Sequence, residues 1–307
     1  MHDALSDILA LIEMRSIPCT RLEAAGEWAW RFPAKPILKF VAVLKGGCWL
    51  ILNGEERYRL ETGDTFLLAN ASDYVVASDP GKRPEDGMAA FDWDRSDIAR
   101  YQGDDTVLLG GGFALEGNNA GLLLDVLPDV MILSAAGPSA AVLHGSLKLL
   151  DEEVRAARMG TTLLTHRLAD ILLVQALRAF VDQGGGGVGG WLAALKDPRL
   201  GASINLMHRT PERQWTLREL AAEAGMSRSS YVAHFKEAVG MPPMEYLRRW
   251  RMEKARDALR NANTSLADLA HDLGFASESS FGNTFKRVFG HSPRNYWATR
   301  DSALVSS

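Results

Sequence analysis

Two stretches of this 307-residue sequence carry cations and small polar side chains at helical spacing, a pattern suited to contact with a DNA duplex. Arg and Lys bind phosphate oxygens, Asn can hydrogen-bond the edge of adenine, and short apolar side chains can contact the thymine methyl group. The candidate DNA-contacting residues of the first stretch are Arg228, Ser229, Ser230, Val232, Ala233 and Lys236. Those of the second stretch are Glu278, Ser279, Ser280, Asn283, Lys286 and Arg287.

Both stretches lie within a segment that the chain repeats. The first copy runs from Leu217 to Tyr246 and the second from Leu266 to Tyr296, a period of about 50 residues that marks a duplicated structural unit. Each copy begins with apolar residues at positions i, i+3 and i+4, continues through a glycine and then a serine (Ser227, Ser277), and ends with Gly-x-x-Pro. This order predicts a short helix, a tight turn and a second helix capped by the serine.

The predicted second helices run from Ser227 to Val239 and from Ser277 to Phe289. In each, aromatic residues would be buried on one face while the candidate DNA-contacting residues occupy the other. A plain helical hairpin of the tetratricopeptide type explains the helices, but it does not explain why the serine cap, the phenylalanine and the Gly-x-x-Pro exit recur together. We therefore predict two helix-turn-helix units, whose second helices enter the major groove.

One long helix is predicted between the two copies, from Met244 to Asn261. Its length of about 27 Å approaches the ~34 Å that separates successive major-groove faces of B-DNA, so it could hold the two units in adjacent grooves. The helix carries five cations, Arg248, Arg249, Arg251, Lys254 and Arg256. We expect some of them to face phosphates and others to pair with the acidic residues Glu245, Glu253 and Asp257.

Residues 190–300 resemble the DNA-binding domain of the AraC/XylS family of bacterial transcription regulators. The resemblance is carried by the runs MSRSSY ending at Tyr231, GFASESSF from Gly274 and TFKRVFG from Thr284. It implies double-stranded promoter DNA and RNA polymerase as partners, and activation rather than repression. Family members often carry Arg or Gln where Ala233 and Asn283 stand. Because Asn283 can read adenine and the methyl groups of Val232 and Ala233 can contact thymine methyls, we expect a site rich in A·T pairs. Lys236, Lys286 and Arg287 are expected to contact phosphates.

The charge distribution agrees with a DNA-binding C-terminal region. Residues 191–307 contain 17 Lys and Arg against 12 Asp and Glu, a net charge of +5. Residues 1–190 contain 17 against 26, a net charge of −9. The near-neutral total therefore conceals a basic region attached to an acidic one.

Residues 17–135 contain short apolar strands separated by turns, such as KFVAVL from Lys39, CWLILN from Cys48 and YVVAS from Tyr74. An Asn53–Gly54 turn follows the second of these strands. This pattern predicts a small double-sheet barrel. The segment also resembles the cupin-like sensory domain of one branch of the same regulator family, in LSDILAL from Leu5, FVAVLKG from Phe40, LETGD from Leu60 and ASDPG from Ala77.

This barrel is not predicted to be a metal-dependent catalyst. No histidine lies between residues 3 and 143, and the two cysteines, Cys19 and Cys48, have no metal-ligand spacing around them. We expect buried structural thiols, no catalytic residue, no metal and no cofactor. A pocket for a small-molecule effector could be lined by aromatic residues, for which plain barrel core is the alternative: Trp28, Trp30, Trp49, Phe66 and Tyr74. An anionic effector could meet Arg21, Arg31, Lys39 or Arg57, for which ordinary surface cations are the alternative.

Two helices are predicted after Pro138. The first has Leu143, Leu147, Leu150 and Val154 on one face, and the second runs from Thr162 to Val181. Inner residues of the second helix are expected to be Leu164, Leu168, Ile171, Leu172 and Gln175. The helices could pack together on the barrel, or the first could pair with its copy in a homodimer. The glycine-rich run 183–190 reads as a flexible linker.

The sequence thus predicts an α+β chain of two domains, with no membrane span and no secretory leader, in the bacterial cytoplasm. The expected parts are a cupin-like barrel (1–137), a helical dimerisation or packing segment (138–182), a linker (183–190), a domain with two helix-turn-helix motifs joined by a long helix (191–300) and a tail (301–307). The predicted function is sequence-specific transcription regulation in response to a small molecule. The alternatives are a constitutive regulator whose barrel only dimerises, and an enzyme that uses the DNA-binding domain for targeting.

Overall fold

The computed structural model describes residues 3–69, 73–94, 96–116, 124, 127–156, 158–183, 190–261 and 265–296. The chain forms two compact units, of which one is Glu13–Val188 and the other combines Met1–Ile12 with Gly189–Ser307. This grouping differs from the sequence-based division, which assigned the first residues to the barrel. Most of the predicted linker, residues 184–189, and the tail 301–307 lie outside the described residues.

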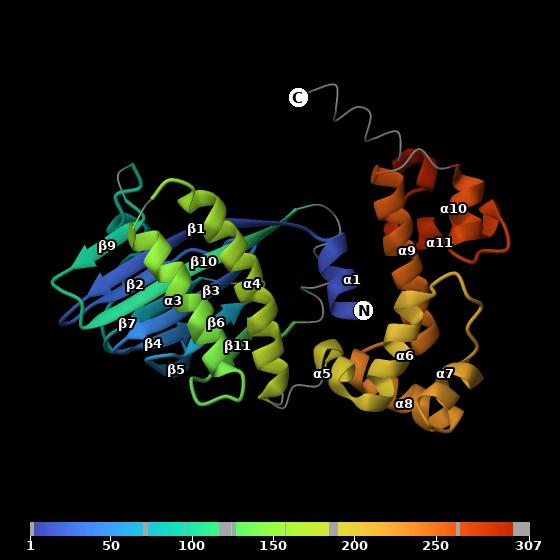
Figure 1. Cartoon of the computed structure of the whole chain (residues 1–307), viewed down its shortest axis with the longest axis horizontal. Helices are drawn as coiled ribbons and strands as arrows, with labels where there is room; N and C mark the ends of the chain where they lie inside the picture. Colours follow the sequence, from blue (N-terminus) through green and yellow to red (C-terminus); the bar gives the residue numbers. More distant parts are fainter. Residues whose placement is uncertain are drawn as a thin grey trace. The chain divides into compact units, whose positions relative to one another are not determined.

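Unit Glu13–Val188 contains two β-sheets, which Figure 1 shows in blue and green. The six-stranded sheet has the order β11-β6-β3-β10-β1-β9, formed by β11 (Val130–Leu133), β6 (Thr65–Leu68), β3 (Ile37–Lys45), β10 (Thr106–Glu116), β1 (Glu13–Ala24) and β9 (Ile98–Tyr101). The five-stranded sheet has the order β5-β4-β7-β2-β8, formed by β5 (Glu56–Glu61), β4 (Gly47–Leu52), β7 (Tyr74–Ala77), β2 (Ala29–Phe32) and β8 (Glu85–Asp86). A 3₁₀ helix, η1 (Met88–Ala90), follows β8.

Local sequence explains the β4–β5 hairpin. Alternate residues of β4 are buried, so that Cys48, Leu50 and Leu52 face the core. Asn53 and Gly54 adopt φ values of 51° and 75°, the left-handed region that the two central residues of a type I′ turn require, and the Glu55 N–H donates to the Leu52 carbonyl at 3.1 Å across this turn. The turn predicted at these residues is confirmed.

The main core of this unit lies between the two sheets. Val41 and Phe66 come from the six-stranded sheet and meet Leu50 and Val76 of the five-stranded sheet in one hydrophobic cluster. Burial between two sheets is what the short alternating strands predicted. The predicted cupin-like, double-sheet fold is therefore confirmed.

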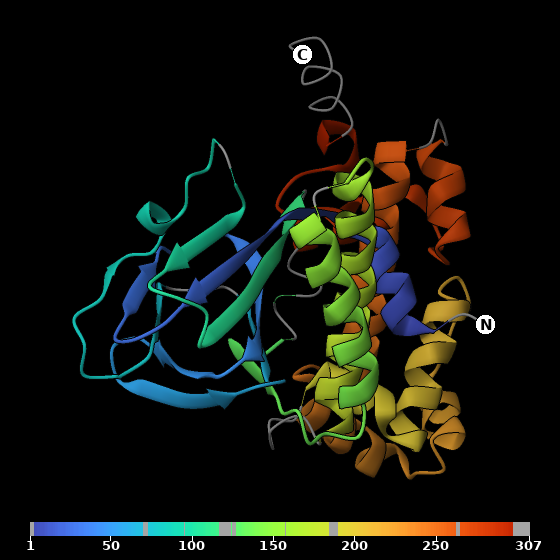
Figure 2. The same cartoon turned by 60° about the vertical axis from the view of Figure 1, so that its left-hand side comes forward.

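Helices α3 (Ala140–Ala156) and α4 (Thr161–Asp182) pack on each other and on β1 of the six-stranded sheet (Figures 1 and 2). Leu143, Leu147 and Leu150 of α3 are buried there, so the structure shows the packed pair, one of the two arrangements that the sequence left open. This face of α3 is occupied within the chain.

The predicted inner face of α4 was wrong at two residues. Leu164 and Ile171 are 48% and 49% exposed, whereas Ala169, Leu172 and Ala176 are buried. Apolar residues occur around most of the circumference of α4, so their spacing in the sequence does not determine which face of the helix is buried. The stripe that packs includes alanines, whose small side chains allow close approach of neighbouring elements.

The second unit is helical in its described part. In neither unit is a helix of the described ranges both long and apolar enough to cross a membrane. The helices of the second unit are α1 (Ala4–Leu11), α5 (Trp191–Lys196), α6 (Pro198–Arg209), α7 (Leu217–Glu223), α8 (Arg228–Val239), α9 (Pro243–Asn261), α10 (Leu266–Asp272) and α11 (Glu278–Phe289). In Figure 1, α9 connects the α7–α8 pair with the α10–α11 pair. The predicted long connecting helix and both helix pairs are confirmed.

Candidate nucleic-acid interface and cavity

The first helix pair is held in shape by its caps. A capping box joins Thr216 and Glu219 at the start of α7, and Gly225 after it has a φ of 62°. The Ser227 hydroxyl accepts a hydrogen bond from the backbone N–H of Ser230 at 3.2 Å and thereby starts α8. Gly240 ends α8 with a φ of 84°. The predicted boundaries of this helix follow from these caps.

The buried face of α8 fixes which residues remain exposed. Tyr231 and Phe235 are fully buried, and the Tyr231 hydroxyl donates to Ser203 Oγ of α6 at 3.1 Å. Of the predicted DNA-contacting residues on this helix, only Val232 is half-buried. The exposed ones are Arg228, Ser229, Ser230, Ala233 and Lys236.

The second pair repeats the arrangement. The Ser277 hydroxyl accepts from the backbone N–H of Ser280 at 3.2 Å, and Phe281 and Phe285 are fully buried. Glu278 is half-buried and accepts a hydrogen bond from Arg294 at 3.0 Å, which neutralises a carboxylate that would otherwise repel phosphate. The exposed candidate residues are Ser279, Ser280, Asn283, Lys286 and Arg287.

The second helices of the two pairs, α8 and α11, are called the recognition helices below, and four of their cations are available to an anionic partner. Their side chains form no hydrogen bond or ion pair with any residue in the described part of the chain: Arg228, Lys236, Lys286 and Arg287. Each is exposed, so it can contact a phosphate without breaking an existing interaction.

Two cations of α9, unlike the four on the recognition helices, form contacts within the chain. Arg256 is buried and forms an ion pair with Glu253, which confirms one predicted pairing. Arg251 donates to the carbonyl oxygens of Pro211 at 2.5 Å and Arg213 at 2.8 Å. Arg248 is exposed. These contacts hold the segment before α7 against the long helix.

A buried polar cluster at the first half of this unit was not anticipated from sequence. Trp191 Nε1 donates to the Tyr246 hydroxyl at 2.7 Å, and His208 Nε2 lies 2.7 Å from the same hydroxyl. Asn205 Oδ1 accepts from the backbone N–H of Ala4 at 2.9 Å, which ties α1 to α6. The N-terminal helix is thus part of the helical unit. No sequence signal identified its partner.

A cavity of about 550 Å³ opens in unit Glu13–Val188. Of the aromatic residues proposed to line a pocket, only Tyr74 lines this cavity. Trp28 and Trp30 stack with ring centroids 4.9 Å apart and belong, with Phe66, to the core between the sheets. Trp49 is half-buried on β4, with the Arg59 guanidinium 5.8 Å from its ring centroid.

Most of the aromatic lining comes from residues outside the predicted set. Phe32, Phe91 and Trp93 line the cavity, and they come from segments that the sequence pattern did not bring together. The aromatic side chains are arranged in two stacked pairs, Phe32 with Tyr74 at 5.3 Å and Phe91 with Trp93 at 4.8 Å between centroids.

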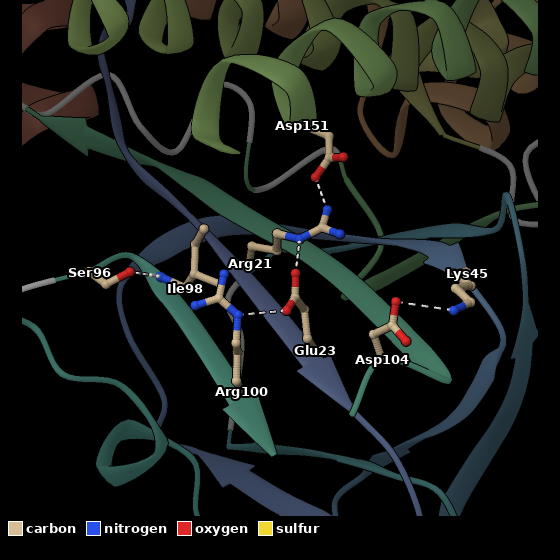
Figure 3. A network of polar contacts seen from close by, with 8 residues as sticks. All are labelled: Arg21, Glu23, Lys45, Ser96, Ile98, Arg100, Asp104 and Asp151. Atoms are coloured by element: carbon tan, nitrogen blue, oxygen red, sulfur yellow. Dashed lines mark hydrogen bonds and ion pairs between the residues drawn. The ribbon is translucent and has the colours of Figure 1, made fainter. Parts of the chain in front are cut away.

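The four cations considered for an anionic effector have different surroundings. Arg21 is buried between Glu23 and Asp151, in the network that Figure 3 shows, and therefore serves the packing of α3 on β1. In the other sheet, Arg31 pairs with an aspartate at 2.6 Å, and Arg57 is exposed on β5 away from the cavity lining. Lys39 alone among the four lines the cavity.

Cys19 and Cys48 are both buried and unpaired, as expected of structural thiols. Burial raises the pKa of each thiol to about 12, so the nucleophilic thiolate is scarce at neutral pH. Across the described ranges, the structure holds no group of three or more His, Cys, Asp and Glu side chains that could bind a metal ion.

Two protein families match separate parts of the chain. The family described as Cupin matches residues 3–182, and the family described as Helix-turn-helix domain matches residues 220–299. A putative AraC-like transcription regulator of Streptomyces lividans is 41% identical over 296 residues, 96% of this chain and 97% of that protein. The HTH-type transcriptional regulator AlkR of Acinetobacter baylyi is 26% identical over 304 residues, 96% of this chain and 98% of that protein.

Among solved structures, the DNA-binding domain of AdpA in complex with a target DNA aligns at 27% identity and a TM-score of 0.34, over 36% of this chain and 99% of that chain. The Streptomyces and Acinetobacter regulators, by contrast, each match 96% of this chain. The chain therefore belongs to the AraC-like transcription regulators, with an N-terminal cupin domain and a C-terminal helix-turn-helix DNA-binding domain.

Proposed function

We propose that this DNA-binding regulator responds to a small molecule held in the cavity of its cupin domain, and that it activates transcription in the bacterial cytoplasm as a homodimer. The observation that carries the proposal is that one chain combines two exposed recognition helices with a separate, preformed cavity. In this scheme RNA polymerase is the further partner, no cofactor is needed, and the protein is not an enzyme.

The recognition helices α8 and α11 would enter successive major grooves. Asn283 can read adenine, and Val232 and Ala233 can contact thymine methyl groups, which together favour a site rich in A·T pairs. Lys236, Lys286 and Arg287 would bind phosphates and set the register of the two helices on the duplex. The 19-residue helix α9 is about 28 Å long and rigid enough to keep their separation.

Chain continuity supports coupling between effector and DNA. Helix α1 belongs to the DNA-binding unit, and at Glu13 the chain passes into β1 of the other unit. Ile17 and Thr20 of β1 line the cavity. A ligand that shifts β1 therefore acts only a few residues from α1. Ligand binding would change the population of α1-docked states, and with it the geometry of the DNA-binding helices.

A second copy of the chain would cover the outer faces of α3 and α4. Each helix exposes apolar residues seven positions apart, Val142 and Leu149 on α3 and Leu164 and Ile171 on α4. These side chains are 48% to 60% exposed, so burying them in a symmetric interface would stabilise the dimer. The α3 face with Leu143, Leu147 and Leu150 is packed within the chain, so the interface would use the face with Val142 and Leu149 instead.

Selection of binding sites from random duplex DNA by the full-length protein tests the DNA-binding part of the proposal. The full chain is required because α1 belongs to the DNA-binding unit. The expected result is two enriched A·T-rich blocks about 10 base pairs apart, one for each recognition helix. Retention of random sequences, abolished by moderate salt, would instead mean that the two helices bind phosphate without specifying sequence.

A further inference from the structure

The cavity of the cupin domain is apolar in most of its described lining, and Lys39 is the less exposed of the two lysines among the described lining residues. Phe32, Tyr74 and Phe91 supply aromatic walls, and Trp93 lies at the edge with half of its surface exposed. A cavity of about 550 Å³ is within the range that encloses a small organic ligand.

Lys39 lies on the inner side of β3. Side chains alternate along a strand, and Val41 and Val43 on the same side belong to the core between the sheets. The ammonium group of Lys39 lies beside Gly110 of the neighbouring strand β10. A Cβ atom on this glycine would lie 3.2 Å from Lys39 Nζ. The same Cβ would lie 3.4 Å from Thr20 Oγ1, so the hydroxyl and the ammonium group share one corner of the cavity.

No described carboxylate serves as a counter-ion for the ammonium group of Lys39. Within the described residues it forms no hydrogen bond or ion pair, and burial lowers its pKa to about 8. Asp97 and Lys35 also line the cavity, but both are exposed, which places one carboxylate and one ammonium group at the opening. The half-buried Lys39 is therefore the charged group that an enclosed ligand meets.

We propose that the cavity binds an organic monoanion with an apolar body, whose anionic group is held by Lys39 and whose body packs on Phe32, Phe91 and Trp93. This inference rests on the proposed function, for which it names the class of effector. An organic cation is disfavoured because it would place a second positive charge beside Lys39. A neutral apolar ligand is disfavoured because it would exclude water from Lys39 without replacing the lost interaction.

A matched pair of fluorescent probes tests the proposed charge preference. Anilinonaphthalene sulfonate and phenylnaphthylamine share an aromatic body, and only the first carries an anionic group. We expect the full-length protein to bind the sulfonate at least about 10-fold more tightly than the neutral amine, as a charge-assisted contact requires. Equal affinities for the two probes, or binding of neither, would overturn the proposal.

Variants locate the preference at Lys39. Lys39→Met should remove the difference between the probes, whereas Lys39→Arg should keep most of it. Lys35→Met is the matched control, because it removes an exposed cation from the opening and should leave the preference largely intact. Trp93→Ala should weaken both probes alike, since it shortens the apolar wall. A preference that persists in Lys39→Met would place the anion elsewhere and overturn the assignment.

DNA affinity separates this inference from the proposed function. The affinity of the full-length protein for its selected DNA site is measured with and without saturating sulfonate. Lys39-dependent probe binding that leaves DNA affinity unchanged would uphold the ligand class and contradict the ligand response. A change in DNA affinity that is absent in Lys39→Met would support both.

Discussion

His208 Nδ1 lies 3.5 Å from a carboxylate oxygen of Asp7, although the two residues are 201 positions apart (208 − 7) in the sequence. The other ring nitrogen of His208 lies 2.7 Å from the Tyr246 hydroxyl, and its ring stacks on Trp250 with centroids 3.9 Å apart. Helix α1 is therefore attached to α6 and α9 through a buried aromatic and polar cluster. A segment that the sequence assigns to the sensory domain is structurally part of the DNA-binding unit.

Replacing Ile8 should loosen this attachment. Ile8 is 3% exposed, and Ile8→Ala is expected to destabilise the DNA-binding unit by about 2–4 kcal/mol because it removes buried methylene groups and leaves a cavity. Thermal unfolding of the full-length protein measures the loss. The exposed neighbour Ala10 provides the control, since Ala10→Ser should change stability little. Equal melting curves for both variants would mean that α1 does not pack on this unit in solution.

The helix-turn-helix boundaries could be predicted because their signals are local. A serine hydroxyl that caps a helix and a glycine that ends one act within a few residues, so Ser227, Gly240 and Ser277 each fix a boundary wherever the rest of the chain lies. The buried Phe235 and Phe285 recur at the same place in both copies, which identifies the core side and leaves the other side for DNA.

The cavity could not be predicted in the same way. Its lining joins β1, β3, β7 and the segment around Trp93, and only the fold brings these together. Lys39 is one of four candidate cations in the sequence, and nothing in the sequence distinguishes it from Arg21. In the structure Arg21 forms ion pairs with Glu23 and Asp151. The partner of α1 was also unpredictable, because an amphipathic helix specifies that one face is buried and not what covers it.

Two substitutions in α11 should separate base reading from phosphate binding. Asn283→Ala should cost about 1–3 kcal/mol on the preferred site and relax the base preference at one position, as expected for loss of a bidentate contact with adenine. Lys286→Ala should weaken binding to all sequences and reduce the salt dependence by about one phosphate contact. Binding titrations on matched and mismatched duplexes at several salt concentrations measure both effects. An Asn283→Ala protein with an unchanged base preference would remove Asn283 from the reading residues.

A charge on the outer face of α3 should separate the proposed dimer. Leu149 is 55% exposed in one chain, and Leu149→Glu is expected to weaken self-association by about 30-fold or more, corresponding to at least 2 kcal/mol. Sedimentation equilibrium of the full-length protein gives the association constant. Lys148→Glu alters the charge of the adjacent exposed residue and serves as the control. Dissociation by both variants alike would indicate a general electrostatic effect.

Lowering the pH should destabilise the folded DNA-binding unit, because His208 is buried there as a neutral ring. Burial lowers the pKa of His208, an effect that the Asp7 carboxylate partly offsets. Below the ordinary histidine pKa of about 6.5, the unfolded chain takes up a proton that the folded unit resists. The stability contributed by neutral His208 is therefore present above about pH 6.5 and is lost as the pH falls through the lowered pKa.

His208→Gln should flatten this dependence, which thermal unfolding between about pH 7 and pH 5 measures. Asp7→Asn should steepen it, because it removes the carboxylate that favours the protonated ring. His234→Gln is the control, since His234 is partly exposed beside the Asp197 carboxylate at 3.2 Å. If His208→Gln retains the slope of the unaltered protein, another group is responsible for the acid sensitivity, and the cluster joining α1 to α6 and α9 does not depend on a neutral imidazole.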